Sequence, residues 1–159
     1  MAQITVITVG TLKEDYLRKG VEEYKKRLSQ YAKVEEIELK EERINDEDDR
    51  SEIERALERE AEKILSKIPK DSVCISLCVE GKQYTSEELA ELMQSAVNTK
   101  GRIALIIGSS HGLSPRVKSA CDVRLSFSKL TFPHQLMKVM LFEALYRSFT
   151  IIAGKKYHK

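Results

Sequence analysis

Two stretches near the carboxyl end carry the residues best suited to chemistry, SFSKLTFPHQ at 126–135 and AGKKYHK at 153–159. In the first stretch, Phe127 and Phe132 can form an apolar slot for a flat ring. The main-chain N–H and C=O groups of residues 128–131 are then free to hydrogen-bond a planar heterocycle such as adenine. The alternative is that both phenylalanines only attach the loop to the core.

The carboxyl-terminal stretch combines an aromatic ring, an imidazole and three lysines. Lysines hold phosphates, and Tyr157 or His158 could stack on an unpaired base, so the stretch is suited to contact with nucleic acid. A frayed, positively charged chain end is the alternative. The histidines and cysteines lack the spacing of a metal site, so no metal is expected, and Cys74 and Cys78 are expected to pack in the core.

A third candidate is the turn GSSHGLS at 108–114. Gly108 and Gly112 would let a ligand approach the main chain closely, because glycine has no Cβ. The turn matches neither the dinucleotide fingerprint nor the phosphate-binding P-loop. A plain turn is therefore the alternative.

The elements that would position these loops follow from the spacing of apolar residues. Short apolar runs predict strands, and apolar residues three or four apart predict helices. Residues 40–50, KEERINDEDDR, contain one apolar side chain, so a mobile loop or a helix lead-in is expected there. The expected strands are 3–9, 34–39, 72–79, 101–107 and 122–127, and the expected helices are 15–31, 53–68, 85–97, 114–121 and 135–149.

Strands that alternate with helices predict an α/β fold with a mostly parallel sheet flanked by helices, in one domain over residues 1–159. Ligands of such sheets bind beyond the carboxyl ends of the strands, where the loops after SLCVEGK and IIG and the 126–135 stretch would meet. The last helix is apolar on nearly every side. We therefore expect part of its surface to be buried against a second copy of the chain.

Composition narrows the class of protein. No run of eighteen apolar residues and no signal peptide occur, and the three cysteines suit a reducing cytoplasm better than a disulfide framework. Residues 124–159 carry seven basic side chains against one acidic one, on a body that is slightly acidic. This asymmetry indicates a polyanionic partner such as nucleic acid, with a solvated basic tail as the equal alternative.

Four segments together resemble the RlmH family of SPOUT-class methyltransferases. They are ITxxxVGxLKExYL near the start, IIGxSxGL in the middle, LSFSKLTFPHQLMxVxLxEALYR, and the terminal YHK. The resemblance covers nearly the whole chain. It implies a sheet with a carboxyl-terminal trefoil knot, a homodimer, S-adenosylmethionine as cofactor, and N3-methylation of a pseudouridine in 23S ribosomal RNA, in the assembled ribosome.

The resemblance also assigns residues. The cofactor would contact Leu77, Gly108, Phe127, Ser128, Lys129, Leu130, Thr131 and Phe132. Tyr157 and His158 would lie near the RNA, within one protomer or across the dimer interface. His158 is the first candidate for the base that removes the imide proton, His134 is the second, and Lys129 could instead neutralise the developing anion.

Two positions depart from the family pattern: Ser109 stands where a second glycine is usual, and Ala153 where an arginine is common. The first departure could tighten the turn, and the second removes a possible phosphate contact. Two other functions stay open, a non-catalytic RNA- or ribosome-binding factor that uses the basic end, and a dinucleotide enzyme. The second lacks the glycine fingerprint.

Overall fold

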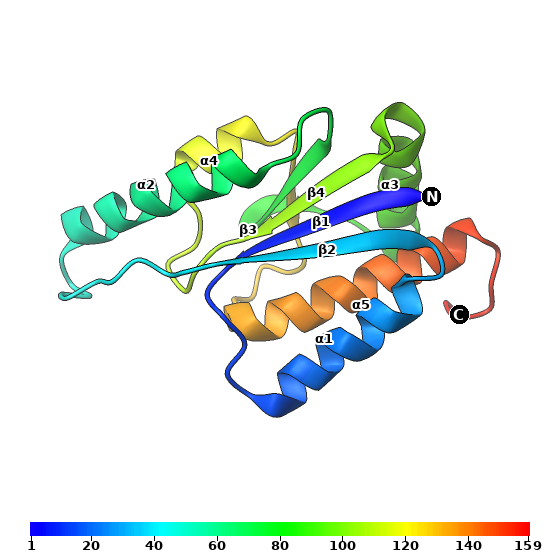
Figure 1. The fold of residues 1–159 in the computed structure, drawn as a ribbon, viewed down its shortest axis with the longest axis horizontal. Helices are drawn as coiled ribbons and strands as arrows, with labels where there is room; N and C mark the ends of the chain where they lie inside the picture. The colour runs from blue at the N-terminus through cyan, green and yellow to red at the C-terminus, as the bar shows by residue number, and fades with distance from the viewer.

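The computed structural model describes all 159 residues as a five-stranded sheet with helices on both faces (Figure 1). All strand pairs are parallel, and the strand order is β2-β1-β4-β3-β5. The predicted α/β class is therefore confirmed. In chain order the elements are β1 (Ala2–Val9), α1 (Asp15–Leu28), β2 (Ala32–Leu39), α2 (Arg50–Lys67), β3 (Val73–Gln83), α3 (Ser86–Lys100), β4 (Arg102–Ile107), α4 (Pro115–Ala120), β5 (Val123–Ser126) and α5 (His134–Ile152).

Alternation along each strand divides the core into two layers, because successive side chains point to opposite faces of a sheet. In β1, Ile4 and Val6 belong to the larger apolar cluster, which α1, α3 and α5 complete. Ile7 and Val9 belong to the smaller cluster, with side chains of α2 and α4. Figure 1 shows α1 and α5 side by side on one face, and α2 and α4 on the other.

The predicted helix starts are observed with their caps. Thr85 and Glu88 form a reciprocal capping box at the start of α3, and the Ser114 side chain accepts a hydrogen bond from the N–H of Val117 ahead of α4. Helix α1 ends three residues earlier than predicted, because Ser29 to Tyr31 form a turn. These differences do not change the topology.

A nearly continuous apolar run such as residues 72–79 predicts a strand covered on both faces, and this is wrong for its second half. Cys74, Ile75 and Ser76 are buried, but Val79 is exposed and the strand continues to Gln83. Its pairing with β5 shifts between Leu77 and Lys82, so the residues between them form a bulge. This bulge lies at the carboxyl edge of the sheet, where it helps to form the site described below.

Most of the buried apolar side chains of α5 pack against elements of the same chain. It packs between α1 and α3 against the sheet, and it buries Leu141, Phe142, Leu145 and Phe149. The apolar composition of α5 is therefore weaker evidence for a second copy than the sequence indicated. The homodimer stays a prediction, as do the single-domain organisation and the trefoil knot.

The acidic segment at 40–49 contains no helix or strand, as predicted, but hydrogen bonds and ion pairs attach it to α2. Glu42 pairs with Lys63 at 2.8 Å, and its N–H donates to Glu60 at 2.9 Å. The N–H groups of Asn45 and Asp46 donate to Glu52. The expected mobility is therefore not supported by these contacts.

Among the helices of the structure, none has both the length and the apolar character that a membrane-spanning helix needs.

Lys138 on α5 provides a test of the packing, because it is a buried charge with one carboxylate partner. Its side chain is 5% exposed and its Nζ lies 3.0 Å from Glu36, which also pairs with Lys25 at 2.8 Å. Burial opposes the charged form of Glu36, but the hydrogen bonds from Lys25 and Lys138 outweigh it and lower the pKa of this carboxyl.

We expect Lys138→Met to lower the free energy of unfolding by about 2 kcal/mol at pH 7, less than for a fully buried pair because Lys25 remains. A lowered folded-state pKa gives stability that is present above the ordinary pKa of 4.5 and is lost as the pH falls further. The deficit of the variant should therefore shrink below that pH. Urea titrations at pH 7 and pH 3.5 measure it, with the half-exposed Lys25→Met as the milder control. A deficit that is constant with pH would contradict the assignment.

Candidate functional site

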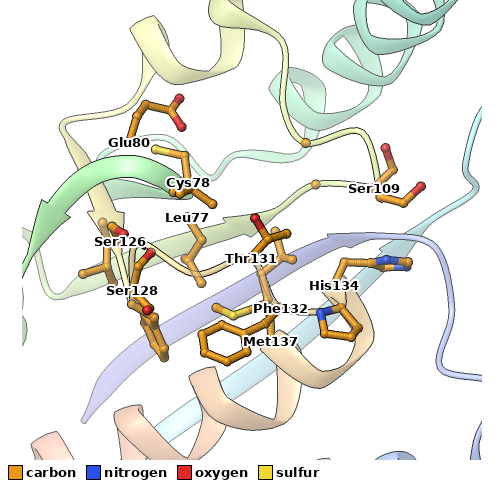
Figure 2. A pocket seen from close by; sticks show the side chains of 18 of the residues that line it. Leu77, Cys78, Glu80, Ser109, Ser126, Ser128, Thr131, Phe132, His134 and Met137 are labelled. Atoms are coloured by element: carbon orange, nitrogen blue, oxygen red, sulfur yellow. Dashed lines mark hydrogen bonds between the residues drawn. The ribbon is translucent and has the colours of Figure 1, made fainter. Parts of the chain in front are cut away.

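A cavity of about 750 Å³ lies at the carboxyl ends of β3, β4 and β5. These strands are neighbours in the sheet, so the segments that follow them come together at one edge. The volume is in the range of small-molecule sites. Figure 2 shows side chains from the end of β3, the turn after β4, the loop after β5 and the start of α5 around this hollow.

The bulge of β3 forms one wall. Cys78, Val79 and Glu80 lie in the bulge and line the cavity. Gly81 is required there, since a Cβ would lie 2.7 Å from the carbonyl oxygen of Arg124. Bulges commonly redirect side chains next to functional sites, and here the bulge turns residues predicted for the core toward the cavity. The prediction of core packing is therefore confirmed for Cys74 and wrong for Cys78.

Hydroxyl groups shape the loop at 127–133, which forms the opposite wall. The Ser126 hydroxyl donates to the carbonyl oxygen of Ser128 at 2.9 Å, and the Ser128 hydroxyl accepts from the N–H of Leu130 at 3.0 Å. The main-chain groups of this loop were expected to be free, which is wrong for the carbonyl of Ser128 and the N–H of Leu130. The main-chain groups of Lys129 and Thr131 make no hydrogen bond within the chain. Of the two residues only Thr131 lines the cavity, so its main-chain groups remain available to a ligand there.

The turn at 108–112 closes the cavity between these walls. The N–H of Gly112 donates to the carbonyl oxygen of Ser109 at 2.9 Å. A Cβ at Gly108 would lie only 2.3 Å from the carbonyl oxygen of Gly112, so the turn itself requires glycine there. Gly112 is required for another reason, its φ of 86°. The two glycines were expected to let a ligand approach the main chain. In the structure Gly108 instead allows the main chain of the turn to approach itself at Gly112.

The charges that line the cavity are mostly paired. Glu80 forms an ion pair with Lys118, and this hydrogen bond lowers the pKa of the Glu80 carboxyl. Burial raises the pKa of the Cys78 thiol, so this cysteine stays protonated and is a poor nucleophile. The cavity is therefore suited to binding and orientation rather than to covalent catalysis.

His134 is the predicted catalytic residue that lines the cavity. It lies at the amino-terminal end of α5, beside the end of β1 (Figure 2). A Cβ at Gly10 would lie 3.6 Å from its Nε2 and 3.8 Å from a carboxylate oxygen of Glu41. The imidazole therefore borders both the cavity and the acidic segment.

Tyr157 and His158 lie beside the second half of α5, away from the cavity (Figure 1). The tail folds back along α5, so that Tyr157 contacts Glu143 and His158 contacts Arg147. These two positions lie roughly 14–20 Å along the helix from its start at His134. The Tyr157 hydroxyl donates to Glu143 at 2.9 Å, and burial together with this bond raises the pKa of Tyr157. Tyr157 therefore remains a neutral hydrogen-bond donor.

The hydrogen bonds of His158 fix its tautomer. Arg147 has only donors, so its contact at 3.0 Å makes Nδ1 of His158 the acceptor. Nε2 then carries the proton and donates to Glu87 at 2.8 Å. In this arrangement neither nitrogen of His158 is free to take a proton from a substrate.

The structure brings together all but one of the residues predicted for the cofactor. Lys129 is exposed and does not line the cavity. Sequence reasoning missed Cys78, Glu80, Ser126 and Met137, which do line it. A glycine two residues after the apolar run, Gly81, was the available signal for the bulge. The residues that line the cavity as predicted are Leu77, Gly108, Phe127, Ser128, Leu130, Thr131, Phe132 and His134.

Comparisons with known proteins found a matching family profile and similar relatives. The profile of a family described as "Predicted SPOUT methyltransferase" matches residues 2–158. A protein of Shouchella clausii (strain KSM-K16) named ribosomal RNA large subunit methyltransferase H is 50% identical over 157 residues, which covers 98% of this chain and 99% of the relative. A protein of the same name from Caldicellulosiruptor bescii is 51% identical over 156 residues, with the same coverage of both chains.

A solved structure shares the fold. It is described as a probable methylase family protein from Haemophilus influenzae Rd KW20. It matches with a TM-score of 0.55 at 15% identity, over 98% of this chain and 70% of the other. At this identity the match supports the fold alone.

The two glycines of the turn should respond differently to alanine. We expect Gly108→Ala to cost about 3 kcal/mol of unfolding free energy, because the added methyl meets main-chain atoms that cannot move independently. Gly112→Ala should cost about 1 kcal/mol, since its Cβ enters open space and only the positive φ is unfavourable. Urea unfolding of both variants measures this order. Equal costs would contradict the observed geometry of the turn.

Proposed function

The chain belongs to the SPOUT methyltransferase family, and from this premise we propose that it methylates N3 of a pseudouridine in 23S ribosomal RNA with S-adenosylmethionine as the methyl donor. The names of its relatives, ribosomal RNA large subunit methyltransferase H, support the class of substrate. The observation that carries the proposal is the cavity at the carboxyl ends of β3, β4 and β5, which the 127–133 loop completes.

The residues around the cavity fit S-adenosylmethionine. Phe127, Phe132 and Leu77 supply apolar surface for a planar base. The unused main-chain groups of Thr131, which lines the cavity, are suited to the polar edge of that base. The turn after Gly108 leaves main chain rather than a side chain at one side of the cavity. A donor and acceptor set of this kind recognises a neutral heterocycle without needing a charged side chain.

When bound, S-adenosylmethionine supplies an electrophilic methyl group on a sulfonium. The chain's own residues have two further tasks: they orient the uracil ring, and they accept or release the imide proton of N3. Orientation supplies the larger part of the lowering of the activation barrier, on the order of 7–11 kcal/mol in favourable cases. His134 is the histidine that borders the cavity, so within one protomer it is better placed than His158 to take the proton.

His158 and Tyr157 are proposed to act from a second copy of the chain. Their contacts with Glu143 and Arg147 lie roughly 14–20 Å along α5 from the cavity of their own protomer, which is too far for contact with one nucleobase. A homodimer in which each tail reaches the partner's cavity would bring Tyr157, a neutral donor, and the basic tail close to the RNA. His158 would first have to exchange its bonds to Arg147 and Glu87 for bonds to the substrate.

The charge distribution supports an RNA substrate. Lys155, Lys156 and Lys159 are exposed at the chain end and form no ion pair in the structure. We propose the assembled ribosome rather than free RNA as the substrate, because a small basic surface would then be supplemented by contacts with the ribosome. A ribosomal substrate would also place the protein in the cytoplasm. The proposal keeps the trefoil knot and the single domain as expectations from the family.

The function is tested by titration and by product analysis. Calorimetry should detect binding of S-adenosylmethionine, and mass spectrometry should detect one methyl group on pseudouridine after incubation with 70S ribosomes that lack the modification. A non-catalytic RNA-binding factor would bind ribosomes but neither bind nor consume the donor. Absence of donor binding together with intact ribosome binding would support that alternative and refute the proposal.

Mixed dimers test the role of the tail. We expect Gly108→Val to abolish donor binding, and His158→Ala to reduce turnover at least tenfold with unchanged donor affinity. If the tail acts across the dimer, an equimolar re-annealed mixture of the two variants should regain about a quarter of wild-type activity, because half of the dimers then contain one intact site. Tails that act within their own protomer would leave the mixture inactive.

A further inference from the structure

The acidic segment at 40–49 and α2 contact the turn at 108–112 through three consecutive polar side chains. The Ser109 hydroxyl donates to Glu60 at 3.2 Å, the Ser110 hydroxyl donates to Glu41 at 3.5 Å, and His111 pairs with Glu47 at 2.7 Å. All three of these turn residues line the cavity, whereas the three carboxylates do not. The polar atoms of the turn are thus held from outside the cavity.

The contact between Ser109 and Glu60 is the buried one. Ser109 is 5% exposed and Glu60 only 3%. Glu60 also accepts the N–H of Glu42 at 2.9 Å, so one carboxyl group connects the acidic segment to the turn. Burial, with further contributions from Glu41 and Glu42, raises the pKa of Glu60, while its two hydrogen bonds oppose the rise. The site therefore tolerates an uncharged group that keeps both hydrogen bonds.

The acidic segment is itself anchored. Glu42 is held by Lys63 and Arg59 of α2, and the N–H groups at the tip of the segment bond to Glu52. Ser109, Glu60 and the anchored segment therefore form a continuous connection from α2 to the turn. Gly108 packs so closely against Gly112 that a Cβ on it would lie 2.3 Å from the Gly112 carbonyl oxygen. The residues of the turn can therefore move only together.

From this arrangement we propose that Glu60 is a positioning residue for the methyl-donor pocket, and that with segment 41–47 it forms a clamp that holds the 108–112 turn against α2. The clamp raises affinity for the donor without touching it, because the pocket is formed before the donor arrives. This assigns a role to the acidic segment and to Ser109. The inference rests on the proposed function for the identity of the donor.

The test is a double-mutant cycle with a rescue variant. Glu60→Leu removes both acceptors, Ser109→Ala removes one donor, and Glu60→Gln keeps both bonds because its amide oxygen accepts from Glu42 and its NH₂ donates to Ser109. Glu62→Gln on the same helix is the matched control, an exposed carboxylate that pairs with Arg116. Calorimetry measures the dissociation constant for S-adenosylmethionine, and hydrogen exchange measures the opening of the turn.

We expect Glu60→Leu and Ser109→Ala each to weaken donor binding about five- to tenfold, the order expected for loss of one buried hydrogen bond. The double variant should be no weaker than the worse single variant. Glu60→Gln and Glu62→Gln should bind as the wild type does. The amides of residues 109–112 should exchange faster in Glu60→Leu and in Ser109→Ala, and the KM for the donor should rise with kcat unchanged.

Two results would overturn the clamp: additive effects of the two substitutions, or a lowered unfolding midpoint with unchanged donor affinity and unchanged exchange in the turn. Ser109→Ala keeps the test valid if Glu60→Leu does not fold. If the wild-type protein binds no S-adenosylmethionine, the proposed function fails, but the exchange rates of the turn in the variants still decide whether the clamp exists.

Discussion

The parallel pairing of β4 with β3 and of β3 with β5 is the constraint on which the site depends. Parallel strands carry their following loops to the same edge of the sheet. The bulge of β3, the turn after Gly108 and the loop after Ser126 therefore meet around one cavity, although they are far apart in the sequence. Nothing in any one of these segments would form a pocket by itself. The apolar faces buried against α1, α3 and α5 hold the strands in this order.

A second constraint is the length of α5. The helix begins at the cavity and ends where the carboxyl-terminal tail begins, so it holds the two groups of predicted catalytic residues apart. The tail folds back along α5, where Glu143 and Arg147 bind it together with Glu87 of α3. Because of this separation, whether His158 can reach a cavity in addition to His134 depends on whether the chain forms a dimer. One protomer can offer His134 alone, whereas an assembly of two can offer both.

Much of the fold could be predicted from the sequence, because local signals and burial agree in most elements. The sequence predicted helices that start at Thr85 and Ser114, and both residues cap the observed helices α3 and α4. The bulge of β3 was missed, since the apolar run continues through Val79 and only tertiary pairing decides that this residue is exposed. The hydrogen bonds of segment 40–49 were missed for a related reason. Their partners lie on α2 and in the 108–112 turn, and charge composition carries no information about distant partners.

The family motifs predicted the residues of the cavity more fully than their spacing could, because such motifs group residues that share a site in the folded protein. They did not reveal that Lys129 does not line the cavity or that the tail lies so far along α5 from it. The central claim is that main-chain groups of the 127–133 loop hold the methyl donor. A crystal structure of the protein with S-adenosylmethionine tests it most directly. The account predicts the adenine beside Phe127 and Phe132, hydrogen-bonded to main-chain atoms of the loop that line the cavity, those of Thr131 among them; donor bound elsewhere, or held only by side chains, would contradict it.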